Sequence, residues 1–306
     1  MARRRKGRNI SGVLLLNKPK GISSNGVLQR VRAMLNASKG GHTGNLDPMA
    51  TGLLPLCFGE ATKFSSYLLD ADKAYIACAR LGQVSDTGDA EGEIIRERPV
   101  PELTEQQILD VMARFTGNIE QIPPMYSALK QNGQPLYKLA REGKTVERKP
   151  RPVTIFQIEL IRWQSPDLTF SVRCSKGTYV RTLAEDMGEA LDCGAHLISL
   201  HRTHTGGFDA SGMIDFDQLQ TEKDSGQSLD GHLLSADILV EHFAKKHLSE
   251  AESKRILHGQ DITNDGDYSG MVRLYDVNSR FIGLAEASAS GRLQPRRLII
   301  TDEGES

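Results

Sequence analysis

Asp47 is the first acidic residue of the chain, and its surroundings make it the strongest candidate for chemistry. The 46 residues before it contain ten lysines or arginines and no Asp or Glu. Pro48 disfavours helical backbone at Asp47, and glycines on both sides let the chain turn sharply. An isolated Asp-Pro pair is usually a surface turn. Here the apolar run Leu53 to Phe58 follows, so we expect a buried strand to anchor a loop that presents one carboxylate amid positive charge.

A second polar motif lies at the predicted start of a helix, in the stretch Lys176-Gly-Thr-Tyr-Val-Arg-Thr-Leu183. The apolar residues Leu183, Met187 and Leu191 follow with helical spacing. Arg181 therefore falls in the first helical turn, where the helix dipole disfavours a cation. A carboxylate from elsewhere in the fold is the simplest partner for this guanidinium.

The segment His42 to Leu54, which reads His-Thr-Gly-x-Leu-Asp-x-x-Ala-Thr-Gly-x-Leu, resembles the catalytic motif of the pseudouridine synthases. The match is to the bacterial TruB type, which modifies uridine-55 in the T loop of tRNA, and it covers about residues 10 to 205 well. The resemblance implies that Asp47 is the catalytic nucleophile. It also implies that Arg181, in a Lys-Gly-x-Tyr-[Ile/Val]-Arg motif, pairs with Asp47, and that Tyr75 stacks on the target base.

The resemblance also implies residues that bind the RNA substrate. His42 is expected to fill the space that a flipped base leaves, unless it is a structural histidine. Tyr179 is expected to pack under the base or near Tyr75, and Leu200 to line the pocket. His201 stands where the family suggests an arginine, which predicts a weaker or pH-dependent phosphate contact. The remaining predicted RNA contacts are basic side chains, namely Lys63, Lys130, Arg141 and Arg202.

The elements before the Asp47 loop follow from hydrophobic spacing. A strand over Val13 to Asn17 leads through a Lys-Pro-x-Gly loop to a helix that Ser23 or Ser24 caps. Lys18, which begins this loop, could bind an RNA phosphate near the helix start. The resemblance favours a different role, in which Lys18 supports the catalytic loop.

The fold class expected from the resemblance is α+β, with a mixed and largely antiparallel central sheet flanked by helices, the pseudouridine synthase fold. Short helices are predicted over Thr62 to Leu69 and after a capping box formed by Thr104 and Gln107. Alternating or continuous apolar runs predict the strands Lys73 to Leu81, Glu93 to Glu97, Val153 to Trp163, Leu168 to Cys174 and Ala195 to Thr203.

The near-neutral net charge of −1 hides a strong asymmetry. Residues 130–181 contain eleven basic and four acidic side chains, whereas residues 209–270 contain five and thirteen. Local basic stretches allow a near-neutral protein to bind a polyanion. We therefore expect the segment of about 124–152, where basic residues alternate with Tyr, Gly and Pro, to be an insertion that grips folded RNA.

The last part of the chain is predicted to form a small barrel-like module that resembles a PUA domain. Thr221 to Gly231 reads as a linker or surface loop. The elements expected after it are a helix around Ser235 to Phe243, a helix capped by Ser249 and Glu252, a hairpin of Met271 to Asp276 with Phe281 to Ala285, and a last strand over Leu298 to Thr301. The predicted division is a basic arm (1–9), a catalytic domain (10–246) and a PUA-like domain (247–306).

Composition excludes several classes of protein. No run of about 18 apolar residues exists, and the apolar stretch near the N-terminus is too short for a signal peptide, so we expect a cytoplasmic location. Cys57, Cys78, Cys174 and Cys193 lack zinc-ligand spacing and are expected to be reduced thiols. We expect no metal and no cofactor, tRNA bound through its T arm as substrate, no required protein partner, and a monomer.

Two other functions stay open at this level. A non-catalytic RNA-binding protein or tRNA chaperone would also explain the basic segments, but it would have no use for Asp47, Tyr75 and Arg181 together. A pseudouridine synthase acting on another RNA would have the same core. The chemical route is also open, because a carboxylate could add to C6 of the base, attack C1′ of the sugar or assist its deprotonation.

Overall fold

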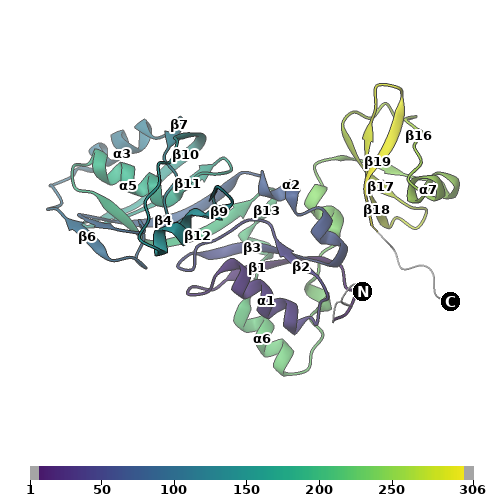
Figure 1. The fold of residues 1–306 in the computed structure, drawn as a ribbon, viewed down its shortest axis with the longest axis horizontal. Coiled ribbons are helices and arrows are strands. Elements are labelled where there is room, and N and C mark those ends of the chain that lie inside the picture. Colours follow the sequence, from purple (N-terminus) through teal and green to yellow (C-terminus); the bar gives the residue numbers. More distant parts are fainter. Residues whose placement is uncertain (1–6, 300–306) are drawn as a thin grey trace.

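The computed structural model describes residues 7–299, so most of the predicted basic arm lies outside the described residues. A large α+β unit contains the Asp47 loop, and a small β-rich unit follows it at one end of an elongated molecule (Figure 1). Among residues 7–299, no helix is both long and apolar enough to cross a bilayer.

A ten-stranded mixed sheet forms the frame of the large unit. Its main path runs β14-β1-β3-β12-β4-β11-β10-β7, while β13 pairs with β12 and β2 with β3. Only the β1–β14 and β12–β3 pairs are parallel, so the predicted largely antiparallel sheet is confirmed. The strands are β1 (Gly12–Lys18), β2 (Gly40–His42), β3 (Thr51–Phe58), β4 (Lys73–Leu81), β7 (Gly117–Gln121), β10 (Arg151–Gln164), β11 (Asp167–Cys174), β12 (Ala195–Thr205), β13 (Phe208–Asp209) and β14 (Ile214–Asp215).

Helices cover one face of this sheet and enclose the main hydrophobic core. They are α1 (Ser24–Met34), α3 (Glu105–Arg114), α5 (Val180–Ala190) and α6 (Phe216–Asp224). Helix α5 buries Leu183 and Met187, two of the residues whose spacing predicted it. The 3-10 helices η1 (Gly59–Lys63) and η4 (Ala236–Val240) pack on the opposite face of β1 and β3.

Local sequence signals set the helix starts. The Ser23 side chain accepts a hydrogen bond from the Gly26 N–H at the start of α1. Capping boxes that begin at Thr104 and Ser249 start α3 and α7 (Glu250–Leu257), as predicted. A cap of this kind typically stabilises a helix by about 1 kcal/mol, so the sequence specifies these boundaries locally.

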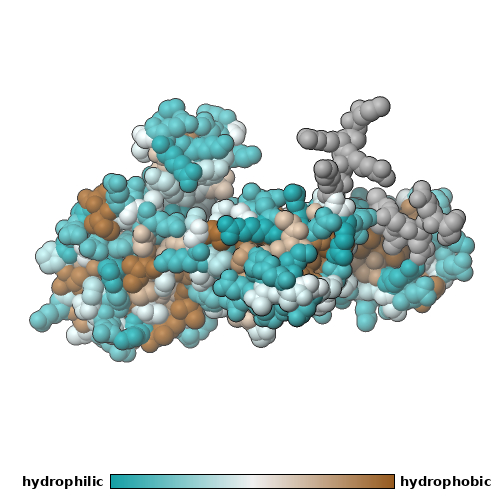
Figure 2. All heavy atoms as spheres, turned by 90° about the horizontal axis from the view of Figure 1, so that it is seen from below, coloured by the Kyte–Doolittle hydropathy of each residue, from teal (hydrophilic) through white to brown (hydrophobic). Residues whose placement is uncertain are grey.

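Two short structures branch from the large unit. The hairpin of β5 (Gln83–Ser85) and β6 (Ile94–Glu97) extends from one end, where Figure 2 shows apolar residues gathered on the surface. The predicted insertion contains the two-stranded ribbon β8 (Lys130–Gln131) and β9 (Gln134–Pro135) and the helix α4 (Leu136–Arg141).

The small unit is a curled five-stranded sheet in the order β15-β17-β18-β19-β16, packed around its own apolar cluster with α7. Its strands are β15 (Ala244–His247), β16 (Ile262–Thr263), β17 (Met271–Tyr275), β18 (Phe281–Ala287) and β19 (Arg292–Leu298). Tyr275, Phe281 and Leu284 join the apolar cluster on the open side of β1 and β3, which ties the two units together.

Four predicted elements differ from the structure. The stretch Thr62 to Leu69 is split between η1 and α2 (Ser66–Leu69), and the Ser235 to Phe243 helix is only the 3-10 helix η4. The predicted linker begins inside α6, which continues to Asp224. The last strand is β19 instead of Leu298 to Thr301, which lies partly outside the described residues. Three arginines, a glutamine and a proline interrupt the apolar pattern in β19, and this composition concealed the strand.

Candidate active site

Asp47 and Arg181 meet at the centre of the large unit. The Arg181 Nε lies 3.0 Å from the Asp47 Oδ2, and it reaches the loop between β2 and β3 from the first turn of α5. The Arg181 side chain is 4% exposed, whereas the Asp47 side chain remains 37% exposed. The arginine is therefore fixed inside the protein, and the carboxylate can still be reached by a ligand.

The backbone around Asp47 is held from α1. The buried Ser24 Oγ donates to the Leu46 carbonyl (3.1 Å) and accepts from the Leu46 N–H (2.8 Å). The Ala50 N–H closes a turn onto the Asp47 carbonyl at 3.0 Å. One hydroxyl thus satisfies both backbone groups of the residue before Asp47, which leaves the loop little freedom.

Replacing Ser24 with Ala is expected to leave the Leu46 N–H and carbonyl unpaired in the core. An unsatisfied buried polar group costs about 1–3 kcal/mol, so we expect a lower melting temperature and a slower catalytic step. Thermal unfolding and single-turnover kinetics would measure both effects. Ser23→Ala is the matched control because it removes only the helix cap, and a Ser24→Ala protein no less stable than Ser23→Ala would contradict this account.

Lys18, the last residue of β1, also holds the Asp47 loop in place. Its side chain is fully buried, and its Nζ donates to the carbonyls of Pro19 (2.8 Å), Ile22 (2.6 Å) and Pro48 (3.3 Å). Burial lowers the pKa of Lys18 to about 8. An ammonium used in this way is not available to an RNA phosphate, so the structure replaces the predicted RNA contact with the supporting role.

Arg181 makes more contacts than the pair with Asp47. Its Nη1 donates to the Thr87 carbonyl and its Nη2 to the Tyr126 carbonyl, both at 2.7 Å. Its Nη1 also lies 3.6 Å from the Asp89 Oδ2. These partners offset the unfavourable position of a cation at a helix start.

Asp89 is not among the site residues that the sequence predicted. Its side chain is 4% exposed and accepts hydrogen bonds from the Thr87 Oγ1 (2.7 Å) and the Glu91 N–H (3.0 Å). Nothing in the local sequence distinguishes it from a turn-forming Asp. Arg181 therefore lies between two carboxylates, of which only that of Asp47 is open to a ligand.

The electrostatic balance at Asp47 has opposing parts. Burial raises the pKa of Asp47 above its ordinary value, the Arg181 cation lowers it, and the Asp89 carboxylate raises it again. Together these effects raise the pKa of Asp47. A carboxylate is nucleophilic only in its ionised form, so a reaction that used Asp47 as a nucleophile should accelerate as the pH rises through this raised pKa.

Replacing Asp89 with Asn should preserve the turn and remove one negative charge near Arg181. We expect the single-turnover rate on the pH plateau to fall by roughly tenfold, because Arg181 loses one of its two carboxylate partners. The acid limb of the rate profile should move to lower pH, because the charge that raises the pKa of Asp47 is gone. An acid limb that moves to higher pH, or an unchanged rate, would contradict this assignment.

Tyr75 and Arg202 lie opposite each other on β4 and β12. Burial raises the pKa of Tyr75, while the nearby Arg202 guanidinium acts in the opposite direction. Arg202 is 1% exposed, and its Nε donates to the Leu53 carbonyl at 2.7 Å. It therefore holds the start of β3, and its burial conflicts with the predicted RNA contact.

Gly52 explains why β3 and β12 can approach so closely. Its φ is +98°, and a Cβ at this position would lie 2.3 Å from the Arg202 carbonyl oxygen. Only glycine fits this position without moving one strand. The glycine of the motif's Thr-Gly pair is thus a packing requirement for the strand that follows Asp47.

Comparison with family models matches three consecutive parts of the chain. Residues 32–180 match the N-terminal domain of the TruB family pseudouridylate synthases. Residues 181–241 match the tRNA pseudouridylate synthase B C-terminal domain, and residues 244–299 match the C-terminal model of pseudouridine synthase II TruB.

Proteins named tRNA pseudouridine synthase B are similar to this chain over nearly their whole length. The one from Stutzerimonas stutzeri is 51% identical over 295 residues (95% of this chain, 96% of the relative), and the one from Chromohalobacter salexigens is 51% identical over 304 residues (98% of each).

The chain belongs to the TruB pseudouridine synthase family.

Solved structures agree with this membership at the level of the fold. The chain is similar to one in a crystal structure of a Cbf5-Nop10-Gar1 complex, with a TM-score of 0.72 and 26% identity over 94% of this chain and 85% of the other. A chain in an H/ACA RNP bound to a substrate RNA has the same TM-score at 23% identity, covering 99% and 92%. The large sheet and the curled C-terminal sheet are thus a known arrangement of this family.

The other site residues of this TruB-family chain have distinct environments. His42 ends β2, and burial lowers the pKa of its imidazole, which favours the neutral form. Tyr179 is the residue before α5, and Leu200 is 7% exposed within the main core beside Ala77. His201 uses its Nδ1 for a 2.8 Å contact with the Thr51 Oγ1.

The basic residues divide into two groups. Lys63 pairs with Glu60 and donates to the Leu298 carbonyl at 2.7 Å, so it links the two units of the molecule. Lys130 and Arg141 are exposed in the insertion, and the Arg141 guanidinium lies 5.7 Å from the Tyr137 ring centre. Of the predicted basic contacts Lys18, Lys63, Lys130, Arg141 and Arg202, only Lys130 and Arg141 are exposed.

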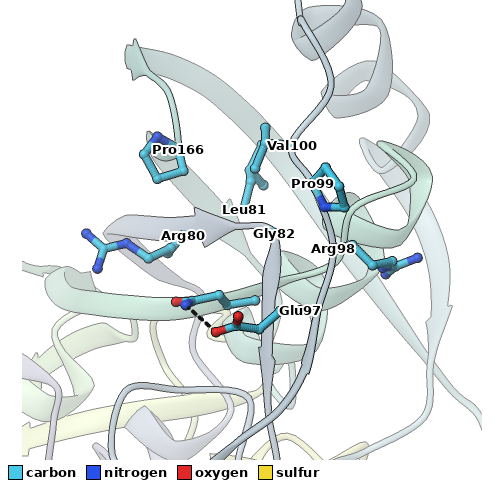
Figure 3. A pocket seen from close by; sticks show the side chains of 9 residues that line it. Arg80, Leu81, Gly82, Glu97, Arg98, Pro99, Val100 and Pro166 are labelled. Atoms are coloured by element: carbon cyan, nitrogen blue, oxygen red, sulfur yellow. Dashed lines mark hydrogen bonds between the residues drawn. The ribbon is translucent and has the colours of Figure 1, made fainter.

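Two surface pockets do not include Asp47 among their lining residues. One of about 540 Å³ is formed where β4 meets the β5–β6 hairpin, with Leu81, Val100 and Pro166 on its walls (Figure 3). The other, of about 400 Å³, includes Lys18, Thr51 and His201. The first contains none of the predicted site residues, so it has no part in the site around Asp47.

Metal binding has no support in the described part of the chain. Residues 7–299 contain no group of three or more His, Cys, Asp or Glu side chains that could hold an ion. The four cysteines are free thiols, as predicted, and Cys57, Cys174 and Cys193 are buried.

Proposed function

We propose that this protein is a tRNA pseudouridine synthase that isomerises uridine-55 in the T loop of tRNA. The observation that supports this most directly is the ion pair of a half-exposed Asp47 with a buried Arg181, inside the family's motif. The relatives that are about half identical over nearly full length are named tRNA pseudouridine synthase B, which supports tRNA as the substrate class.

The reaction needs one nucleophile and a way to hold the base. The bond from N1 to C1′ breaks, the uracil turns, and a bond from C5 to C1′ forms. The hydrogen at C5 leaves to solvent and N1 gains a proton, so the reaction has no net redox change. In our proposal Asp47 provides the nucleophile, and Arg181 favours its ionised form against the opposing effect of burial. Attack on C6, attack on C1′ and assistance in deprotonating the sugar are all compatible with its position.

The target uridine must leave its stack before Asp47 can reach it. Extruding a base costs a few kcal/mol, which contacts in the pocket must offset. In our proposal Tyr75 stacks on the flipped uracil, Tyr179 and Leu200 complete the pocket, and His42 fills the vacated space. The exposed Lys130 and Arg141 of the insertion grip the backbone of the T arm.

The domain organisation follows from this proposal. Residues 10–246 form the catalytic domain and residues 247–306 a PUA-like RNA-binding domain, although the C-terminal sheet already begins with β15 at Ala244. We propose that the enzyme acts in the cytoplasm as a monomer, without a guide RNA, a protein partner or a cofactor.

Tritium release tests the reaction and the RNA class together. RNA labelled with tritium at C5 of uridine loses the label when C5 bonds to C1′. We expect one equivalent of release from an unmodified tRNA transcript and none from a ribosomal RNA fragment of equal length. Equal release from both RNAs would contradict the substrate assignment, and binding of tRNA without any release would favour the alternative of an RNA-binding protein or chaperone.

A further inference from the structure

We propose that Gln121 is a positioning residue that sets the location of Arg181 by holding the backbone at the start of α5. This inference rests on the proposed function, because its effect is measured on the pseudouridine-forming step. Gln121 is the last residue of β7, an edge strand of the large sheet. It contacts Tyr179, which lies 58 positions further along the chain.

The contact is two-sided. The Gln121 Nε2 donates to the Tyr179 carbonyl at 3.3 Å, and the Gln121 Oε1 accepts from the Tyr179 N–H at 3.0 Å. Gln121 is buried and only 2% exposed. A buried amide that satisfies both backbone groups of one residue restricts it much as a strand partner would.

Helix α5 needs such a contact because it has no side-chain cap. Tyr179 is its N-cap residue and makes no capping hydrogen bond with its own side chain. Its carbonyl accepts the first helical bond from the Leu183 N–H at 3.0 Å. Gln121 therefore fixes the residue from which the helix starts, and Arg181 lies two positions further along.

Gln121 also lies at the root of the insertion. In the β7–β10 ladder it is opposite Arg151, so the two ends of the 124–152 segment meet beside it. From within that segment the Tyr126 carbonyl accepts from the Arg181 Nη2 at 2.7 Å. The root of the insertion therefore contacts Arg181 directly through Tyr126 and indirectly through Gln121 and Tyr179.

The consequence is a link between the insertion and the catalytic pair. The Arg181 Nε pairs with Asp47, and its Nη2 donates to the Tyr126 carbonyl at the base of the insertion, while its Nη1 contacts Thr87 and Asp89. A displacement of α5 would change the distance between the guanidinium and the carboxylate. Misplacement of a catalytic group by about 1 Å can cost roughly 100-fold in rate, so a contact of this kind is expected to affect the catalytic step more than RNA binding.

The test compares Gln121→Met, which removes both hydrogen bonds at similar volume, with Gln121→Glu, which retains the acceptor. In the full-length enzyme we expect Gln121→Met to lower the single-turnover rate by roughly 10- to 100-fold at saturating enzyme, with the tRNA dissociation constant changed less than about threefold. An ionised Gln121→Glu keeps an acceptor for the Tyr179 N–H but cannot donate to the Tyr179 carbonyl and places a charge in a buried position, so it should also be slower than wild type. Thr154→Val is the matched control, because it removes the 2.8 Å bond to the Asn118 side chain elsewhere in the same β7–β10 ladder.

A double-mutant cycle separates positioning from general stability. In an Arg181→Lys background the guanidinium is already absent, so adding Gln121→Met should slow the reaction by less than about threefold. Equal slowing in both backgrounds would overturn the inference, as would a wild-type rate for Gln121→Met. If the wild-type enzyme itself forms no pseudouridine, the proposed function fails and this inference fails with it, whereas an active wild type isolates the role of Gln121.

Discussion

Replacing Asp47 with Asn is expected to reduce pseudouridine formation by more than roughly 10⁴-fold while tRNA binding changes by less than about 1.4 kcal/mol, a factor of ten. The amide keeps the shape of the side chain and its contact with Arg181 but is not a nucleophile. Asp47 is 37% exposed and lies in a loop whose backbone is held by Ser24 and Lys18, so the substitution should not disturb the fold.

A second Asp–Arg pair in the same protein provides the control for this experiment. The Arg80 Nε lies 2.8 Å from the Asp167 Oδ1, and the Asp167 side chain is 35% exposed, close to the value for Asp47. This pair is beside the pocket in Figure 3 and away from the predicted site. Asp167→Asn should therefore retain the wild-type rate, and appreciable turnover by Asp47→Asn would remove Asp47 from its assigned role.

Replacing Arg181 with Met is expected to have the second largest effect. The substitution leaves the buried carboxylate of Asp89 and the half-exposed carboxylate of Asp47 without their cation. Removing one partner of a buried ion pair lowers the free energy of unfolding by about 3–5 kcal/mol. Because Asp47 is partly exposed, we expect the loss of stability to be near the lower value. We expect a lower melting temperature and a rate at least roughly 10³-fold below wild type.

The pH profile distinguishes this effect from a loss of stability alone. The Arg181 cation lowers the pKa of Asp47, so its removal should raise that pKa further. The residual rate of Arg181→Met should then continue to rise with pH beyond the range in which wild type reaches its plateau. Arg80→Met is the matched control, and an acid limb that stays in place would contradict the pairing of Arg181 with a catalytic carboxylate.

The sequence predicted the parts of the site that local rules specify. The disfavoured position of Arg181 at a helix start indicated a missing carboxylate partner, and that helix was expected from the spacing of Leu183 and Met187. The motif around Asp47 predicted a loop anchored by a buried strand, and the Ser23 cap and the capping boxes set helix boundaries. These features depend on neighbours a few positions away in the chain.

The residues that were missed or reassigned depend on contacts across the fold. Asp89 is 92 positions from Arg181 in the chain, and its sequence neighbours indicate only a turn. Gln121 contacts Tyr179 only because β7 ends beside the start of α5. Arg202 was expected to meet RNA because it is basic, and Lys18 was a candidate for a phosphate contact, but both are buried and bind backbone carbonyls. Charge in a sequence does not reveal whether a side chain faces solvent.

The most direct test of the central claim is a map of pseudouridine at single-nucleotide resolution in an unmodified tRNA transcript. The transcript is incubated with the wild-type enzyme and, separately, with Asp47→Asn. We predict a single modified position, uridine-55 in the T loop, after incubation with wild type and no modified position after incubation with Asp47→Asn. Modification at another position by wild type would contradict the proposed specificity, and modification of uridine-55 by Asp47→Asn would contradict the proposed nucleophile.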